Sequence, residues 1–427
     1  MTSSLIRMKD PDQKDYSTVF FINILGSLFI YLVIFLCAPF IADFYKIPLL
    51  KIVVRIYSIS FIIQALVGVQ TTRLTKAMNF KLQMLMQIPS AIIGGIVGIL
   101  LAYLGFGVWS LVWMTLVRAT VFMLQHWFYT DWRPIFIIDR ERLRYHFGFG
   151  YKLTLSGLLD VLYNNSYNLI IGKLFSATQL GYYNQADTLR MFPVNNISSA
   201  LSKVTYPMFA SIQHDNIKLK MAYKKLMQQV LFWILPIMLS LIIIAAPLFN
   251  FVIGAKWLPA VPYFQILSIA AIAYPFHIYN LNIINVKGRS DLFLRLEVIK
   301  KVVGVVLIAC AIYFGMNGLL FSQIVLSFTA VYINTFYSGK MINYTLREQL
   351  KDVWPMIVIG ILVTLITWCV KEFLLQKYSM SSLLVIVLIE LLYFTLYIVI
   401  SRVLNIPAVN DLAEILKLKK FKKIQKG

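Results

Sequence analysis

The stretch STVFFINILGSLFIYLVIFLCAPFIA, at residues 17–42, contains no Asp, Glu, Lys or Arg. A helix needs roughly 20 residues to cross a hydrocarbon core about 30 Å thick, and this stretch is long enough. Eleven further apolar stretches of comparable length follow it, at residues 50–73, 82–104, 107–129, 147–174, 180–211, 224–253, 259–285, 291–313, 316–338, 353–371 and 381–403. The sequence therefore predicts an all-α, polytopic membrane helix bundle with about 12 transmembrane helices.

The composition is typical of the same class. Hydrophobic residues make up 59% of the chain and the mean hydropathy is +0.76, whereas soluble domains have roughly 45–50% apolar residues. Cys37, Cys310 and Cys369 all lie inside apolar stretches, which predicts small core residues and neither disulfides nor a metal site. The four histidines form no HxxxH or HExxH pair, so no metal and no cofactor are predicted.

Three short motifs recur at nearly constant offsets. Ala38-Pro39-Phe40-Ile41 corresponds to Ala246-Pro247-Leu248-Phe249, and two further motifs recur 210 residues later: Ile56-Tyr57-Ser58-Ile59 as Ile266-Leu267-Ser268-Ile269, and Tyr103-Leu104-Gly105 as Tyr313-Phe314-Gly315. Tandem halves of this kind are frequent in transporters, which bind their substrate between the halves. The pattern predicts two homologous lobes around a central cavity.

The repeat also suggests a division of the chain. We expect an N-lobe at 1–129 with four helices of six, a C-lobe at 130–339 with six, two additional helices at 340–403 and a basic cytoplasmic tail at 404–427. The counterparts of the helices at 147–211 would lie before Met1, so the first helices of the N-lobe are expected to be missing from this reading frame.

The net charge of +22 follows the predicted topology. Of the 40 Lys and Arg residues, 30 fall in alternate connections that include both termini, and only 7 fall in the intervening ones. Cytoplasmic loops carry this excess in membrane proteins, so both termini are predicted to be cytoplasmic. The charge therefore does not indicate nucleic-acid binding.

The remaining three cations, Arg118, Arg190 and Lys203, lie within apolar stretches. Arg118 is at the middle of its stretch, where a guanidinium facing lipid would cost at least about 2.5 kcal/mol. No acidic residue lies in that stretch or in the three before it, which favours a water-filled cavity that binds an anion. A structural ion pair or carbonyl clamp is the alternative.

Polar residues form stripes on the two predicted helices that follow. At 100° per residue the first stripe occupies one sector of the helix at 147–174, and a narrower stripe continues on the helix at 180–211. Such stripes line a lumen or hold helices together. Besides Arg118, the candidate substrate-binding residues are Lys152, Ser156, Asp160, Tyr163, Asn164, Asn168, Asn195, Ser199 and Lys203. Neither a Gly-rich phosphate loop nor a Ser-His-Asp arrangement is visible, so a non-enzymatic protein is predicted.

Several longer motifs carry a family resemblance. They are Asp15-Tyr16-Ser17-Thr18-Val19-Phe20, the run from Tyr163-Asn164-Asn165 to Ile171-Gly172-Lys173-Leu174-Phe175, Leu180-Gly181-Tyr182-Tyr183-Asn184, Lys256-Trp257-Leu258-Pro259-Ala260-Val261-Pro262, and Gly288-Arg289-Ser290-Asp291-Leu292. With these motifs the chain resembles, nearly end to end, the polysaccharide (O-antigen type) flippases of the multidrug/oligosaccharidyl-lipid/polysaccharide exporter superfamily.

The resemblance implies fourteen helices around a cationic cavity that opens alternately to the two sides of the bacterial inner membrane. It implies translocation of undecaprenyl-diphosphate-linked oligosaccharide for lipopolysaccharide O-antigen or exopolysaccharide biosynthesis. The implied partners are the lipid-linked substrate, membrane lipids, and a polysaccharide polymerase and glycosyltransferases. A lumen that contains Arg118, Lys152, Asn164 and Asn168 would suit a diphosphate and its sugar.

Two other classes are alternatives. A MATE-like drug or cation exporter would share the fold but should place buried carboxylates where this chain has cations. A membrane glycosyltransferase or polymerase should show a large external loop with catalytic residues, and the longest external connection here has about ten residues.

Overall fold

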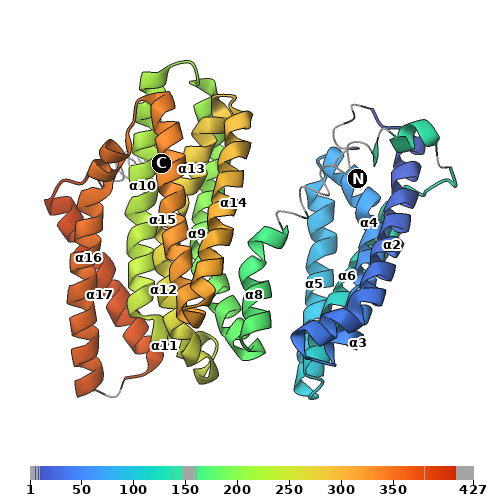
Figure 1. The fold of residues 1–427 in the computed structure, drawn as a ribbon, viewed down its shortest axis with the longest axis horizontal. Helices are drawn as coiled ribbons and strands as arrows, with labels where there is room; N and C mark the ends of the chain where they lie inside the picture. The colour runs from blue at the N-terminus through green and yellow to red at the C-terminus, as the bar shows by residue number, and fades with distance from the viewer. Residues whose placement is uncertain are drawn as a thin grey trace, which may run out of the picture. The chain divides into compact units, whose positions relative to one another are not determined.

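A computed structural model of the chain describes residues 5, 8, 10–137, 139–144, 146–147, 158, 161–378 and 380–409, without the side chains of 199–204, 206–207, 210 and 290. It separates into two compact units, Met1–Ser166 and Tyr167–Gly427. All regular elements in the described ranges are helices, as Figure 1 shows. The predicted all-α fold class is confirmed.

The first unit consists of a small helical bundle. Its helices are α2 (Gln13–Tyr45), α3 (Leu50–Tyr57), α4 (Ile59–Lys76), α5 (Phe80–Tyr103) and α6 (Val108–Tyr129). α2 packs against α3 and α4, while α6 packs against α4 and α5. The unit's described apolar core is small and lies around Val19, Phe20, Val69 and Trp132. Large apolar side chains such as Phe40 and Ile99 are more than 70% exposed, as expected of a lipid-facing surface.

The second unit is larger and is centred on one long helix. Its helices are α8 (Ser166–Leu174), α9 (Ala177–Ser211), α10 (Asn216–Ile243), α11 (Ala245–Val252), η1 (Ala255–Ala260), α12 (Val261–Ile272), α13 (Tyr274–Val286), α14 (Ser290–Ile312), α15 (Gly315–Ile342), α16 (Leu346–Lys377) and α17 (Ser382–Val403). α10 contacts α9, α12, α13 and α16. Of its most apolar window, 61% is buried inside the protein, which makes it the core helix of this unit.

Within the described residues, nine segments are long and apolar enough to cross a membrane. They are Gln13–Tyr45, Leu50–Lys76, Phe80–Tyr103, Val108–Tyr129, Asn216–Ile243, Ala255–Val286, Gly315–Ile342, Leu346–Lys377 and Ser382–Val403. The predicted stretches at 180–211 and 291–313 are also helical, as α9 and α14, but they contain more charged residues. The stretch at 147–174 lies partly outside the described residues, and its last part forms α8. The chain is a multi-pass membrane protein.

Three predicted spans are interrupted by breaks that we did not predict, and the one at 224–253 divides at Ile244, between α10 and α11. The span at 50–73 divides at Ser58, whose hydroxyl donates to the carbonyl of Arg55 at 3.0 Å and competes with the regular helical pattern. The span at 259–285 divides at Ala273, two residues before Pro275. A proline ring lacks the N–H that would continue the helical hydrogen bonds.

The three cysteines are exposed, whereas the sequence predicted core positions for them. Cys37, Cys310 and Cys369 lie on α2, α14 and α16 as predicted, but all three are exposed and have free thiols. The prediction of core positions was wrong because a membrane helix is apolar on its lipid-facing side as well as on its packed side. Apolar neighbours in the sequence therefore do not distinguish the two sides.

The repeated Tyr-X-Gly motif has the same conformation in both units. Its glycine follows the end of α5 as Gly105, with φ of 82°, and the end of α14 as Gly315, with φ of 68°. A glycine adopts this left-handed conformation without the steric cost of a Cβ, which makes it the usual residue just beyond a helix end. Each copy of the motif therefore supplies a left-handed glycine at the junction between two helices.

Candidate functional site

A cavity of about 580 Å³ lies among α4, α5 and α6 of the first unit, and Arg118 lines it. Arg118 is near the middle of α6, and its side chain is exposed. The remaining lining residues are rich in hydroxyl and amide groups: Gln64, Val67, Gly68, Thr71, Thr72, Gln83, Gln87, Ser90, Thr115, Ala119 and Phe122. The described lining contains no carboxylate, so the cavity combines one positive charge with neutral hydrogen-bonding groups.

Arg118 has no ion pair within the described residues, and its backbone is fixed by Gly94 of α5. A Cβ added at Gly94 would lie 2.7 Å from the Cβ of Arg118 and 2.9 Å from the carbonyl oxygen of Met114. Gly98 has a similar relation to Met114, at 3.0 Å. These glycines allow α5 and α6 to approach closely, and this close packing determines where the Arg118 side chain begins.

The glycines allow a matched test of this packing. We expect Gly94→Ala to destabilise the protein by about 1–3 kcal/mol, because the added methyl group forces the two helices apart. Gly95→Ala is the control, because nothing lies within 4 Å of the added Cβ and alanine favours helix by up to about 1 kcal/mol. Thermal unfolding in detergent measures both effects. Equal midpoints for the two variants would contradict the close approach.

Hydrogen bonds fix one wall of the Arg118 cavity. His126 is fully buried, and its Nδ1 lies 2.9 Å from the carbonyl of Phe122, so that nitrogen donates. Its Nε2 then accepts from the hydroxyl of Thr71 at 3.3 Å. The amide nitrogen of Gln83 donates to the carbonyl of Thr71 and to the hydroxyl of Thr75. Both histidine nitrogens have partners, so this histidine supports the wall.

The other candidate residues are only partly described. Lys152, Ser156 and Asp160 lie outside the described residues, as do the side chains of Ser199 and Lys203 on α9. Tyr163 and Asn168 are half-buried, and Asn164 and Asn195 are exposed. Whether these residues share a lumen with Arg118 stays a prediction.

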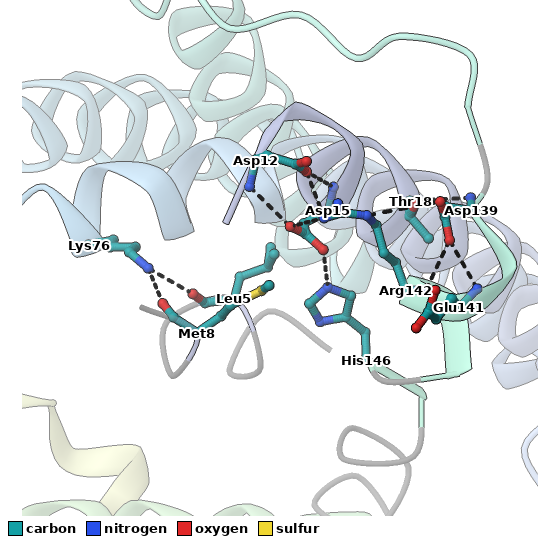
Figure 2. Close-up of polar contacts among 10 residues, drawn as sticks. All are labelled: Leu5, Met8, Asp12, Asp15, Thr18, Lys76, Asp139, Glu141, Arg142 and His146. Carbon is teal, nitrogen blue, oxygen red and sulfur yellow. Dashed lines mark hydrogen bonds and ion pairs between the residues drawn. The ribbon is translucent and has the colours of Figure 1, made fainter. Parts of the chain in front are cut away.

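A second polar cluster fixes the start of α2 to the connection after α6, and Figure 2 shows it. The Asp15 carboxylate, of which 1% is exposed, forms an ion pair with Arg142 and lies 3.2 Å from Nε2 of His146. Asp12 and Asp15 form a capping box at the start of α2. Because Asp15 accepts its hydrogen bond and supplies negative charge, the pKa of the Arg142 guanidinium is raised above its usual value.

Neighbouring hydroxyls extend this attachment. The hydroxyl of Ser17 accepts from the backbone N–H of Ile135 at 3.1 Å, and that of Thr18 accepts from the N–H of Asp139 at 3.3 Å. Ser17 and Thr18 are fully buried. The polar residues of the motif at 15–20 therefore hold the connecting chain on α2.

Within the described residues Arg190, unlike Arg118, forms an ion pair and hydrogen bonds to neighbouring helices. Its guanidinium donates to the carboxylate of Asp187 at 2.6 and 2.8 Å, and also to the carbonyl of Leu267 and the amide oxygen of Gln323. The Gln323 amide nitrogen donates to the hydroxyl of Tyr183 at 2.8 Å. These bonds join α9, α12 and α15. The sequence signal for this pairing was the acid three residues before the arginine, which sequence reasoning missed.

The family follows from comparison with known proteins. A family model described as polysaccharide biosynthesis protein matches residues 1–262, more than half of the chain. The chain belongs to this family. This confirms the resemblance suggested by the sequence motifs.

Two relatives are biosynthesis proteins of polysaccharides. The chain is 26% identical over 298 residues to the teichuronic acid biosynthesis protein TuaB of Bacillus subtilis. This match covers 68% of this chain and 60% of TuaB. It is 24% identical over 270 residues to the succinoglycan biosynthesis transport protein ExoT of Rhizobium meliloti. This match covers 63% of this chain and 55% of ExoT. The matches thus span little more than half the length of either relative.

A solved structure gives the fold. The lipid II flippase MurJ in an inward closed conformation matches with a TM-score of 0.71 and 16% identity, over 95% of this chain and 88% of that structure. This family member therefore has a MurJ-like fold. The identity is too low to transfer MurJ's substrate.

Several of the family motifs contain residues that contact one another. Tyr182, from the motif at 180–184, packs edge-on against Trp257, from the motif at 256–262, with ring centroids 6.1 Å apart. In the motif at 288–292, Arg289 forms two parallel hydrogen bonds of 2.9 Å to Asp291. These contacts account for the motifs through packing and local pairing.

Proposed function

We propose that the protein translocates a lipid-linked oligosaccharide, carried on an undecaprenyl diphosphate, across the bacterial inner membrane for cell-surface polysaccharide biosynthesis. The observation that carries this proposal is the Arg118 cavity, where a cation without a described ion pair faces hydroxyl and amide groups in the middle of the membrane-spanning unit. A guanidinium binds phosphate oxygens through parallel hydrogen bonds, and neutral polar groups suit sugar hydroxyls.

Family membership and the fold support the proposal. Polysaccharide biosynthesis is the family's description, and a flippase has the same fold. A drug or cation exporter would be served better by a carboxylate, which the described lining of the Arg118 cavity does not contain.

The proposed lumen continues from Arg118 onto polar residues later in the chain. We propose that Lys152, Ser156, Asp160, Tyr163, Asn164, Asn168, Asn195, Ser199 and Lys203 extend the polar wall from Arg118. Lobes at 1–129 and 130–339 would then alternate their access to the two sides, with the helices at 340–403 outside them. The same proposal includes a mechanism without catalysis, and it includes a polymerase and glycosyltransferases as partners.

The experiment that tests the function follows the substrate in cells. In a strain that lacks the gene, lipid-linked oligosaccharide is expected to accumulate in the cytoplasmic leaflet, and surface polysaccharide is expected to fall. The gene on a plasmid should reverse both changes. Normal surface polysaccharide in the deletion strain, with no other family member expressed, would contradict the proposal.

We further propose that both termini are cytoplasmic, because 30 of the 40 Lys and Arg residues lie on the side of the membrane that contains them. An enzyme reporter that is active only outside the cytoplasm, fused after Gly427, is expected to be silent. The same reporter inserted after Tyr103, in a connection without Lys or Arg, should be active. The reverse pattern would mean that the orientation is inverted.

A further inference from the structure

A second cavity in the first unit, of about 490 Å³, lies at the end of α4 near the connection that follows α6. Its polar and aromatic lining includes Tyr16, Gln70, Arg73, Asn79, Asp131 and Trp132. It shares no lining residue with the Arg118 cavity. The function proposed above makes no use of it.

Gln70 is the feature that indicates a ligand. Only 1% of this residue is exposed, and both its amide nitrogen and its amide oxygen are buried without a hydrogen-bond partner among the described residues. Burying an amide without partners is unfavourable, and native proteins rarely do so. Gln70 lines the cavity, so a rotation of its side chain would bring the amide against a bound group, which needs both donor and acceptor capacity to satisfy it. A hydroxyl group has this capacity.

Arg73 supplies a charge beside that amide. Its guanidinium carbon lies 5.3 Å from the ring centroid of Tyr16 and 5.7 Å from that of Trp132, so the two rings hold it in place. It forms no ion pair with a carboxylate in the described part of the chain. Lys76, in contrast, donates to the backbone carbonyls of Leu5 and Met8. Arg73 is therefore the cation of this cavity that is available to an anion.

Asp131 narrows the class of ligand. It is exposed, lines the same cavity, and would repel a ligand that is purely anionic. A carboxylate accepts hydrogen bonds from the hydroxyls of a polyol, and an amide both accepts from them and donates to them. A guanidinium pairs with a phosphate. We propose that this cavity is a binding site for a phosphate ester of a polyol, with the phosphate on Arg73 and hydroxyls on Gln70 and Asp131.

Two sources have this chemistry. One is the headgroup of an anionic phospholipid, phosphatidylglycerol, and the other is a glycosyl phosphate. Tyr, Trp, Arg and Lys gather at the level of lipid headgroups in membrane proteins, and this cavity contains all four types. The site does not depend on glycan export, so the two proposals can fail separately.

The test measures binding to the full chain purified in detergent. The probes are dihexanoyl phosphatidylglycerol, glucose 1-phosphate, dihexanoyl phosphatidylethanolamine and inorganic phosphate, each followed by the shift in thermal unfolding and by calorimetry. We expect at least one of the first two to bind and the last two to bind at least tenfold more weakly. Binding of phosphatidylglycerol alone assigns the site to lipid, and binding of glucose 1-phosphate alone assigns it to a glycosyl phosphate.

Variants link the binding to this cavity. Gln70→Leu and Arg73→Gln should each weaken binding at least tenfold, whereas Lys81→Gln, an exposed cation that does not line the cavity, should leave it unchanged. Gln70→Leu removes an unpaired buried amide, so the unfolding temperature of the unliganded variant should not fall. Unaltered affinity in Gln70→Leu, equal binding of inorganic phosphate, or no binding of either polyol phosphate would overturn the proposal.

Discussion

Arg118→Ala is expected to abolish glycan export while the protein is still made and inserted. The guanidinium has no ion pair in the described part of the protein, so its removal leaves no buried partner uncompensated. A hydrogen bond to a charged group is worth about 1.5–3 kcal/mol, so loss of a bidentate phosphate contact should reduce transport at least about tenfold. Surface polysaccharide and the leaflet distribution of the lipid-linked oligosaccharide measure this in the deletion strain.

Two further variants give the arginine prediction its specificity. Arg118→Lys should retain part of the export, because the charge survives but the planar, two-pronged geometry does not. Lys51→Ala removes an exposed cation of α3 and should have no effect. Wild-type export by Arg118→Ala would assign this arginine a structural role, as would loss of protein in both Arg118 variants.

The largest expected effect on stability is at Asp15. Asp15→Ala removes the buried carboxylate that contacts both Arg142 and His146, together with half of the capping box of α2, while Arg142 keeps its ion pair with Asp12. The expected loss is about 2–4 kcal/mol, because a hydrogen bond to a charged group contributes about 1.5–3 kcal/mol and a helix cap about 0.5–2 kcal/mol. Thermal unfolding in detergent should show the loss, whereas Asp10→Ala, at an exposed position, should unfold like the wild type.

A double-mutant cycle isolates the pair itself. Asp15→Asn and Arg142→Gln should each destabilise the protein. The double variant should lose less unfolding free energy than the sum of the losses in the two single variants. The difference measures the coupling between the two side chains. Strict additivity would mean that they do not interact in the folded protein.

The helices could be predicted from the sequence because a run of about 20 apolar residues has few alternatives in a membrane. The breaks within the runs depend on local hydrogen bonding. Pro275 was a visible signal for the break at Ala273, but a serine such as Ser58 usually sits inside a membrane helix without interrupting it.

The candidate site was predictable only where a residue type was exceptional for its position. Arg118 stood out as a mid-span cation without an acid, and the structure places it on a polar cavity. Arg190 is also a cation within a predicted span, but Asp187 lies three residues before it in the same span and forms an ion pair with it. The role of Gly94 depends on how close α5 and α6 approach, and that distance follows from tertiary packing, which the pattern of one helix does not contain.

The central claim is that the protein moves a diphosphate-linked glycan through the cavity that Arg118 lines. The most direct measurement reconstitutes the purified protein in vesicles that carry a lipid-linked oligosaccharide in both leaflets and follows the inner pool with a membrane-impermeant lectin outside. Wild-type protein is predicted to make the inner pool accessible, and Arg118→Ala is predicted to leave it protected, as in vesicles without protein. Protection of the inner pool with wild-type protein, or equal exposure with both proteins, would contradict the account.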